Sequence, residues 1–136
     1  MLNDISTDLA DPPRFDLPGA KAREPFDPAT LDEHRKKYAD ITPLLMRKSP
    51  EAAFAQAIAV AEKLKWDVTA RDPAAHRFQA VDTTPIFRFK DDISVRISDR
   101  PDGCIVDVRS KSRVGKDDFG KNAKRIREFL KLLSVV

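Results

Sequence analysis

The sequence is poor in cysteine, with a single one, Cys104, among 136 residues. One cysteine excludes an internal disulfide, and neither a second cysteine nor a paired histidine lies near it to complete a zinc site. Cys104 alternates with Val106 and Val108, which is typical of a strand with one buried face. We therefore expect a buried thiol, with a reactive thiol as the alternative.

Long apolar runs are also missing. The longest uncharged stretches are a few residues, far short of the roughly 18 apolar residues of a membrane-spanning helix. Met1 to Asp4 lack the basic start and apolar centre of an export signal. We expect a soluble chain, either cytoplasmic or an envelope-facing soluble domain of a larger protein.

Catalytic groups are few. His34 lies beside Glu33 and Arg35, and His76 lies beside a turn, so neither has a nucleophile or metal ligand close in sequence. Asp91-Asp92 is better explained by a turn than by a bound cation, because adjacent strand residues point to opposite faces. We expect no enzyme, no metal and no cofactor. A cleft that joins His76 or an acid to Ser or Cys would overturn this.

Proline is concentrated at one end of the chain. Seven of the ten prolines lie in the first fifty residues, which disfavours long helices and central strands there. We predict an extended arm, residues 1–48, that wraps a core domain, residues 49–136. A short helix is expected from Thr30 to Lys37, with Thr30 as N-cap and Glu33 in the capping-box position. Six apolar side chains are expected to insert from the arm into the domain surface: Ile5, Leu9, Phe15, Leu17, Phe26 and Tyr38.

The remaining residues predict two helices around a run of strands. Ser49-Pro50-Glu51 is a strong helix start, and that helix should reach about Lys65. A second helix should open near Lys116 or Asp117, with an apolar stripe from Phe119 to Leu133. The predicted strands are 66–71, 76–82, 86–90, 93–98 and 104–110, with a bend or bulge at 91–92. The expected fold is α+β, a two-layer sandwich with an antiparallel sheet of four to five strands and two helices on one face.

Charges on neighbouring strands suggest how they pair. If 93–98 and 104–110 are antiparallel with their apolar residues on one face, Arg96 falls opposite Asp107 and Ser94 falls opposite Arg109. An ion pair between strands then accounts for two of the charges without any ligand.

Three stretches resemble a known family. They are Leu2-Asn-Asp-Ile-Ser-Thr-Asp, Asp91-Asp-Ile-Ser-Val-Arg-Ile, and the long run from Val106 to Ile126, which contains Arg-Ser-Lys-Ser-Arg-Val-Gly-Lys-Asp-Asp-Phe-Gly. The sequence is similar in these stretches to domain of unknown function family 1499. The resemblance implies a bacterial protein and an association with the cell envelope, because members often carry the domain behind membrane-spanning segments or an export signal. It implies no particular reaction or ligand.

The last third of the chain is basic. Residues 109–131 contain nine Lys or Arg against three Asp or Glu, an excess larger than the +3 of the whole chain. Unpaired amides at the start of the last helix would favour an anion. The candidate anion site comprises Arg109, Ser110, Ser112, Arg113 and Lys116. The alternative is that Asp117 or Asp118 caps these amides and that the arginines pair with acids on the sheet.

A second possibility is nucleic-acid binding by the last helix. Its phosphate contacts would come from Lys121, Lys124, Arg125 and Lys131, with Arg127 at the margin. Phe87 and Phe89 alternate as base-stacking platforms would, although their expected place is the core. Our leading hypothesis is a non-enzymatic accessory or binding domain for an anionic small molecule, a lipid head group or a protein partner. Nucleic acid is the less favoured alternative.

Overall fold

The computed structural model describes residues 1–20, 23 and 25–136. Its six strands form one antiparallel sheet in the order β1-β6-β5-β4-β3, and β2 also pairs with β6. The strands are β1 (Asp4–Ser6), β2 (Leu44–Met46), β3 (Asp67–Asp72), β4 (Arg77–Thr83), β5 (Lys90–Arg100) and β6 (Gly103–Ser112). The helices are α1 (Leu31–Lys37), preceded by a 3-10 turn (Pro28–Thr30), α2 (Pro50–Lys63) and α3 (Lys121–Ser134).

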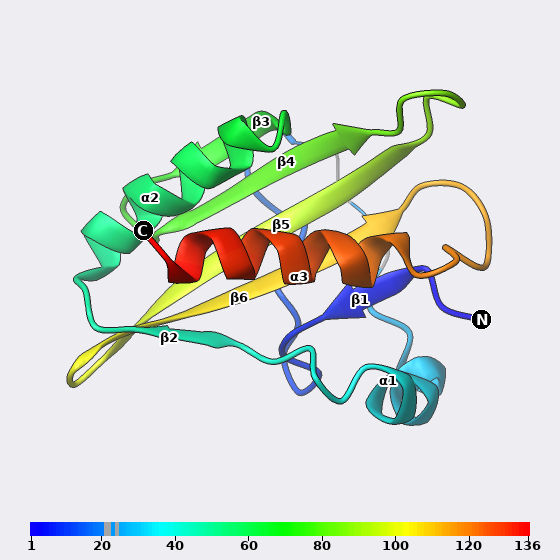
Figure 1. The fold of residues 1–136 in the computed structure, drawn as a ribbon, viewed down its shortest axis with the longest axis horizontal. Coiled ribbons are helices and arrows are strands. Elements are labelled where there is room, and N and C mark those ends of the chain that lie inside the picture. Colours follow the sequence, from blue (N-terminus) through cyan, green and yellow to red (C-terminus); the bar gives the residue numbers. More distant parts are fainter. Residues whose placement is uncertain (21–22, 24) are drawn as a thin grey trace.

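The predicted α+β class is confirmed, and α2 and α3 lie side by side across one face of the sheet (Figure 1). The sheet has six strands rather than four or five, because the arm contributes two short ones. β1 and β2 occupy the same edge of β6, opposite residues 109–111 and 104–106 respectively. A segment of three residues is too short to show strand alternation in the sequence. It forms a strand here because the edge of β6 offers unpaired backbone groups.

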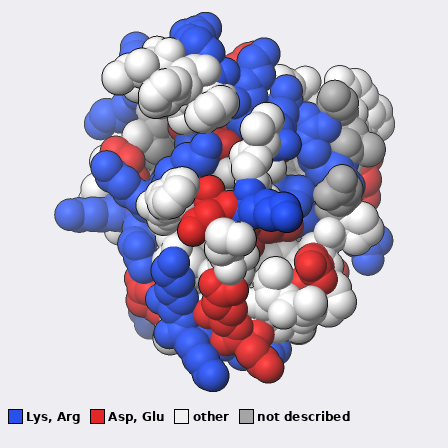
Figure 2. Space-filling model, turned by 90° about the vertical axis from the view of Figure 1, so that its right-hand side faces the viewer, with Lys and Arg blue, Asp and Glu red and all other residues white. Residues whose placement is uncertain are grey.

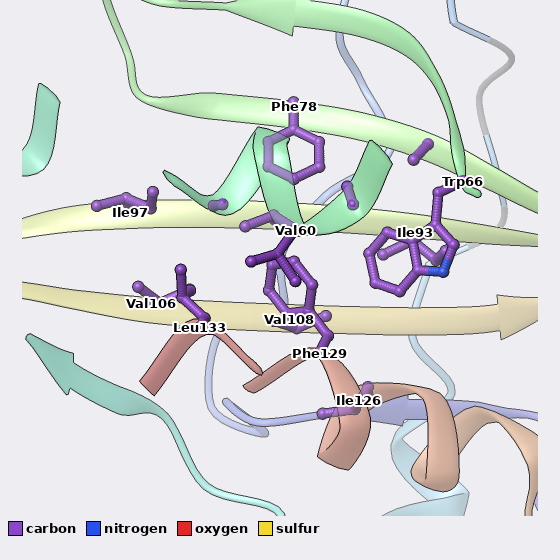
Figure 3. Packing of buried hydrophobic residues seen from close by; sticks show 14 of the residues in the cluster. Val60, Trp66, Phe78, Ile93, Ile97, Val106, Val108, Ile126, Phe129 and Leu133 are labelled. Atoms are coloured by element: carbon purple, nitrogen blue, oxygen red, sulfur yellow. The ribbon is translucent and has the colours of Figure 1, made fainter. Parts of the chain in front are cut away.

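The hydrophobic core lies between the sheet and these two helices. Phe78, Val95 and Val108 from the three central strands are fully buried against the helices. Trp66 stacks on Phe129 of α3 with a distance of 5.0 Å between ring centroids, and Figure 3 shows both rings in this layer. Cys104 is buried in the same cluster, as its alternation predicts.

α2 begins as predicted and ends slightly early. The Ser49 hydroxyl accepts a hydrogen bond from the Ala52 amide at 3.2 Å, and Pro50 is the first helical residue. The last helical residue is Lys63 rather than Lys65, because Lys65 adopts a left-handed backbone with φ of 68°.

The position predicted for the first short helix is confirmed, because α1 ends at Lys37 and Thr30 is its N-cap residue. The Thr30 side chain makes no capping hydrogen bond, and Asp27 caps the preceding 3-10 turn by accepting from the Ala29 amide. The predicted start of the last helix is wrong. α3 begins at Lys121, because Phe119 and Gly120 have left-handed φ values of 52° and 84°. Such values cannot belong to a right-handed helix.

The segment around Asp91 also differs from the prediction. Residues 84–89 form a loop instead of a strand, and Asp91 and Asp92 lie inside β5 without a bend. They pair with Ser112 and Lys111 of β6. Two buried carboxylates are tolerated inside this strand because each is paired with cationic side chains, as described below.

Candidate functional site

The second face of the sheet is polar and is covered by the arm, which passes behind the sheet in Figure 1. The Ser94 hydroxyl donates to the carbonyl of Arg14 at 2.8 Å, and the Arg96 guanidinium donates to that of Asp11 at 2.9 Å. The Leu17 amide donates to the Gln79 side chain at 2.7 Å. The polar sheet residues therefore act mainly as partners of the arm backbone.

Arg109 is the central side chain of this buried face. Its Nε and Nη2 donate to the two carboxylate oxygens of Asp4 at 2.9 and 2.7 Å, and its Nη1 donates to the Pro13 carbonyl at 3.2 Å. The aromatic rings of Phe15 and Phe26 lie 4.8 and 5.6 Å from its guanidinium carbon. Arg109 thus connects β6 to β1 and to later residues of the arm, and it does not face solvent.

The predicted cross-strand register is confirmed. Arg96 lies opposite Asp107, and Ser94 lies opposite Arg109. The Arg96 guanidinium is 3.5 Å from the Asp107 carboxylate and also forms an ion pair with Asp8 at 3.0 Å.

A hollow of about 580 Å³ lies between the arm and this face. Among the described residues, its charged lining consists of Asp11, Asp16, Arg14, Arg23 and Arg109. Arg23 and Arg109 are already paired with Asp92 and Asp4. Two acids therefore face the remaining Arg14, and this balance does not favour an anionic ligand.

Ser110 and Ser112 lie on the opposite face, under α3. The Ser110 hydroxyl donates to Oδ1 of Asn122 at 2.7 Å, and Nδ2 of Asn122 donates to the Ser112 hydroxyl at 2.9 Å. The same amide nitrogen donates to Asp118 at 2.8 Å. Asn122 is fully buried and uses both ends of its side chain within this cluster.

The cations that flank Asn122 in the sequence also form ion pairs. Arg125 forms ion pairs at 2.8 Å with Asp91 and with Asp82, and Lys121 lies 3.1 Å from Asp91. Two of the four predicted nucleic-acid contacts, Lys121 and Arg125, therefore hold the buried Asp91 carboxylate. Lys124 and Lys131, the other two, are exposed.

Arg113 and Lys116 complete the predicted anion site. Arg113 donates twice to Asp92, at 2.9 and 2.8 Å. Burial by itself raises the pKa of Asp92, but hydrogen bonds from Arg113 and Arg23 outweigh it and hold the pKa below its usual value. Lys116 is exposed in the loop before α3.

The five predicted anion-site residues are thus not brought together. Strand alternation sends Arg109 to the arm face and Ser110 and Ser112 to the helix face, while Arg113 and Lys116 lie beyond the strand. Asp117 and Asp118 accept hydrogen bonds from the amides of Phe119 and Gly120 at 3.0 and 2.8 Å. These carboxylates occupy the turn where the anion was expected.

Exposed apolar side chains gather at one end of the sheet, on the β4–β5 loop (84–89) and the β6–α3 loop (113–120). The expectation that Phe87 and Phe89 belong to the core is wrong, because both are exposed. Their rings stack with centroids 5.7 Å apart. Pro85 was the signal of a loop here, because proline cannot donate to a sheet. We call five side chains the apolar tip: Ile86, Phe87, Phe89, Val114 and Phe119.

The two loops are joined at their bases. The Arg113 amide donates to the Lys90 carbonyl at 3.2 Å. The ammonium group of Lys121 lies 5.6 Å from the centre of the Phe89 ring. Both loops leave neighbouring strands at the same end, as Figure 1 shows at its right-hand side.

Exposed cations lie on the same loops and on the first turn of α3. We call Arg88, Lys90, Lys116 and Lys124 the basic rim. Within residues 84–90 and 113–124 the carboxylates are Asp117 and Asp118, which are half-buried and buried respectively. In the upper part of Figure 2, at the height of the β4–β5 loop, Lys and Arg border uncoloured side chains, and the larger groups of Asp and Glu lie below.

Residues 4–133 match the family described as Protein of unknown function (DUF1499). The chain belongs to this family. Its match covers the arm as well as the two-layer domain, so the ion pairs between Asp4 and Arg109 lie inside the family's extent. No curated protein matches the chain.

Two further observations concern the described residues alone. Their His, Cys, Asp and Glu side chains nowhere form a group of three or more that could hold a metal ion. None of the helices in that part of the chain combines the length and the apolar character needed to cross a bilayer.

Proposed function

We propose that this chain is a non-enzymatic binding domain, associated with the bacterial cell envelope, that engages an anionic partner with its basic rim. The observation that carries this proposal is the asymmetry of charge at the loop end of the sheet. There the cations Arg88, Lys90, Lys116 and Lys124 are exposed, whereas the neighbouring acids Asp91 and Asp92 are buried in ion pairs. An anionic small molecule, a lipid head group and an acidic protein surface all fit such a field.

The placement of the two histidines and the cysteine supports binding over catalysis. His34 is buried, and its Nε2 accepts a hydrogen bond from the Ser6 amide at 3.1 Å. His76 lies 3.5 Å from Glu51, a carboxylate that is largely exposed. Burial raises the pKa of the Cys104 thiol, which disfavours the nucleophilic thiolate.

The association with the cell envelope rests on the family resemblance. The exposed charges are compatible with it, because anionic head groups attract clustered Lys and Arg.

A titration of the backbone amides by NMR tests this proposal. Inorganic phosphate, glycerol 3-phosphate as a soluble head-group analogue, and a short oligonucleotide are added separately at two salt concentrations. We expect saturable shifts in residues 84–90 and 113–124 with the phosphate compounds. The variant K116E/K124E should abolish them, and K63E, an exposed lysine on α2, should not. The absence of shifts with every probe would contradict the proposal.

Nucleic-acid binding remains the alternative, and it has one favourable observation, the exposed pair Lys124 and Lys131 on α3. Oligonucleotide binding that falls steeply with salt and is lost in K124E/K131E would favour it. If the oligonucleotide shifts the amides of the same residues as glycerol 3-phosphate and binds with no higher affinity, the phosphate group alone is recognised.

A further inference from the structure

We propose that the apolar tip inserts into the interfacial region of an anionic lipid bilayer, so that the partner bound by the basic rim is a membrane surface. This inference rests on the proposed function and specifies its partner. It begins from exposure: the five side chains of the apolar tip are between 46 and 90% exposed. Exposed apolar side chains rimmed by polar residues are typical of an interaction surface, and Phe87 and Phe89 stack directly on each other within this one.

The backbone holds these side chains away from the core. In the β4–β5 loop, the Thr84 amide donates to the Phe89 carbonyl and the Phe89 amide donates to the Thr84 hydroxyl, both at 2.8 Å. These two bonds close the loop at its base, so residues 85–88 project from the sheet. Arg88, the last of these four residues, has a left-handed φ of 58°.

Phe119 in the second loop is held in a similar way. Its φ is 52°, a conformation that is uncommon for a bulky side chain, and its ring is the most exposed of the tip. The Asp117 carboxylate accepts a hydrogen bond from the Phe119 amide at 3.0 Å and fixes this turn. A strained backbone that keeps an aromatic ring in water indicates a functional constraint on that ring.

The tip can enter an interface without exposing unpaired backbone groups at its base. The Thr84–Phe89 bonds and the bond between Arg113 and Lys90 satisfy these amides inside the protein. These three amides therefore need no hydrogen-bond partner from the lipid interface.

Charge selects the partner. The cations of the basic rim lie on the two loops of the apolar tip and at the adjoining starts of β5 and α3. Aromatic and basic side chains together are typical of proteins that bind anionic membrane surfaces. A second copy of this chain would oppose the same cations to one another, so repulsion disfavours self-association through this end. The combination favours an anionic bilayer, which offers both phosphate groups and a place for the apolar rings.

The experiment is flotation of the full chain with vesicles of phosphatidylcholine alone and of phosphatidylcholine mixed with phosphatidylglycerol. We expect binding to the mixed vesicles only, weakened by salt. The variant F87S/F119S should reduce vesicle affinity more than about tenfold. The matched control is L45S, because Leu45 is 73% exposed but lies on β2.

A second readout measures depth. In F119W, brominated lipids should quench the new tryptophan, whereas Trp66 is buried in the core and should respond little. Vesicle binding without such quenching would overturn insertion of this loop.

The failures of the two proposals are distinguishable. F87S/F119S should keep the amide shifts with glycerol 3-phosphate, whereas K116E/K124E should lose both those shifts and vesicle binding. If glycerol 3-phosphate binds but the native chain ignores mixed vesicles, the membrane inference is overturned and the proposed function stands. If neither binds, both are overturned. Vesicle binding that is undiminished in F87S/F119S also overturns the inference.

Discussion

The Nε2 atom of His34 in α1 accepts a hydrogen bond from the backbone amide of Ser6 in β1, at 3.1 Å and fully buried. Because Nε2 accepts, it carries no proton, and the single proton of the neutral ring is on Nδ1. The ring lies between Phe26 and Tyr38, with centroid distances of 6.1 and 5.7 Å. Protonation of Nε2 would break this link between the two arm segments.

The His34 link predicts a loss of stability at mildly acidic pH. Burial lowers the pKa of His34 below its usual value of about 6.5, and this outweighs the nearby Asp4 carboxylate, which acts in the opposite direction. The unfolded chain therefore takes up this proton before the folded chain does. The contribution is fully present above about pH 6.5 and is lost as the pH falls through that value towards the folded pKa.

Urea denaturation at about pH 7.5 and about pH 5.5 measures this effect. The native chain should be less stable at the lower pH. H34Q can still accept the Ser6 hydrogen bond but does not titrate, so its pH dependence in this range should be weaker. The prediction is wrong if both proteins lose the same stability. Asp92 does not interfere, because its lowered pKa confines its own loss to a range below about pH 4.

Removing the partner of Arg109 should loosen the arm. D4N leaves a guanidinium buried on the sheet with a weaker acceptor in place of a bidentate carboxylate. We expect a cost of about 3 kcal/mol, because a buried charge that loses its partner is strongly destabilising. Relative to the native chain, D4N should accelerate amide hydrogen exchange more in residues 4–17 than in α2.

The control for D4N is D32N, which removes the exposed ion pair between Asp32 and Arg35 on α1. It should change stability by less than about 0.5 kcal/mol. Equal effects of the two substitutions would show that the Asp4 contact is unimportant for the arm.

Asn122 should tolerate substitution poorly although it is polar. Replacing it with Ala leaves the buried Ser110 hydroxyl, the Ser112 hydroxyl and Asp118 without their shared partner. The expected cost is about 2 to 3 kcal/mol, measured by urea denaturation. K124A, on the exposed side of the same helix, should lie within about 0.5 kcal/mol of the native chain. A neutral N122A would mean that water replaces the amide without loss.

Gly103 should be required at the tight turn between β5 and β6. It has a φ of 153°, and a Cβ atom there would lie 2.0 Å from the Met46 carbonyl oxygen of β2. G103A should therefore displace β2 and cost about 2 kcal/mol or more. G19A is the matched control: its φ is 85° but no atom lies within 4 Å of the added Cβ, so only the backbone cost of about 1 kcal/mol applies. Equal costs would exclude the clash with β2.

Short-range signals account for the parts of the fold that were predicted correctly. The alternation of Ile93, Val95 and Ile97 identified the buried face of β5, and the same alternation in β6 was enough to pair Arg96 with Asp107. The Ser49-Pro50 start of α2 was equally clear, because capping depends on adjacent residues. The long motif from Val106 to Ile126 indicated the family, whose model then matched residues 4–133.

Contacts between distant segments decided the rest. The residues of the candidate anion site are separated because alternation along β6 places Arg109 and Ser110 on opposite faces of the sheet. There Arg109 binds Asp4 and Ser110 binds Asn122, two residues from opposite ends of the chain. Phe87 and Phe89 are of a residue type that is usually buried in a core, and Pro85 signals a loop, but their exposure is visible only in the tertiary structure, where β4 ends at Thr83 and β5 begins at Lys90. The sequence of this protein therefore determined by itself which faces of its helices and strands are apolar, since those faces follow from local periodicity. Which charges are neutralised and which remain exposed depended on the tertiary structure, because ion pairs form between residues that only folding brings together.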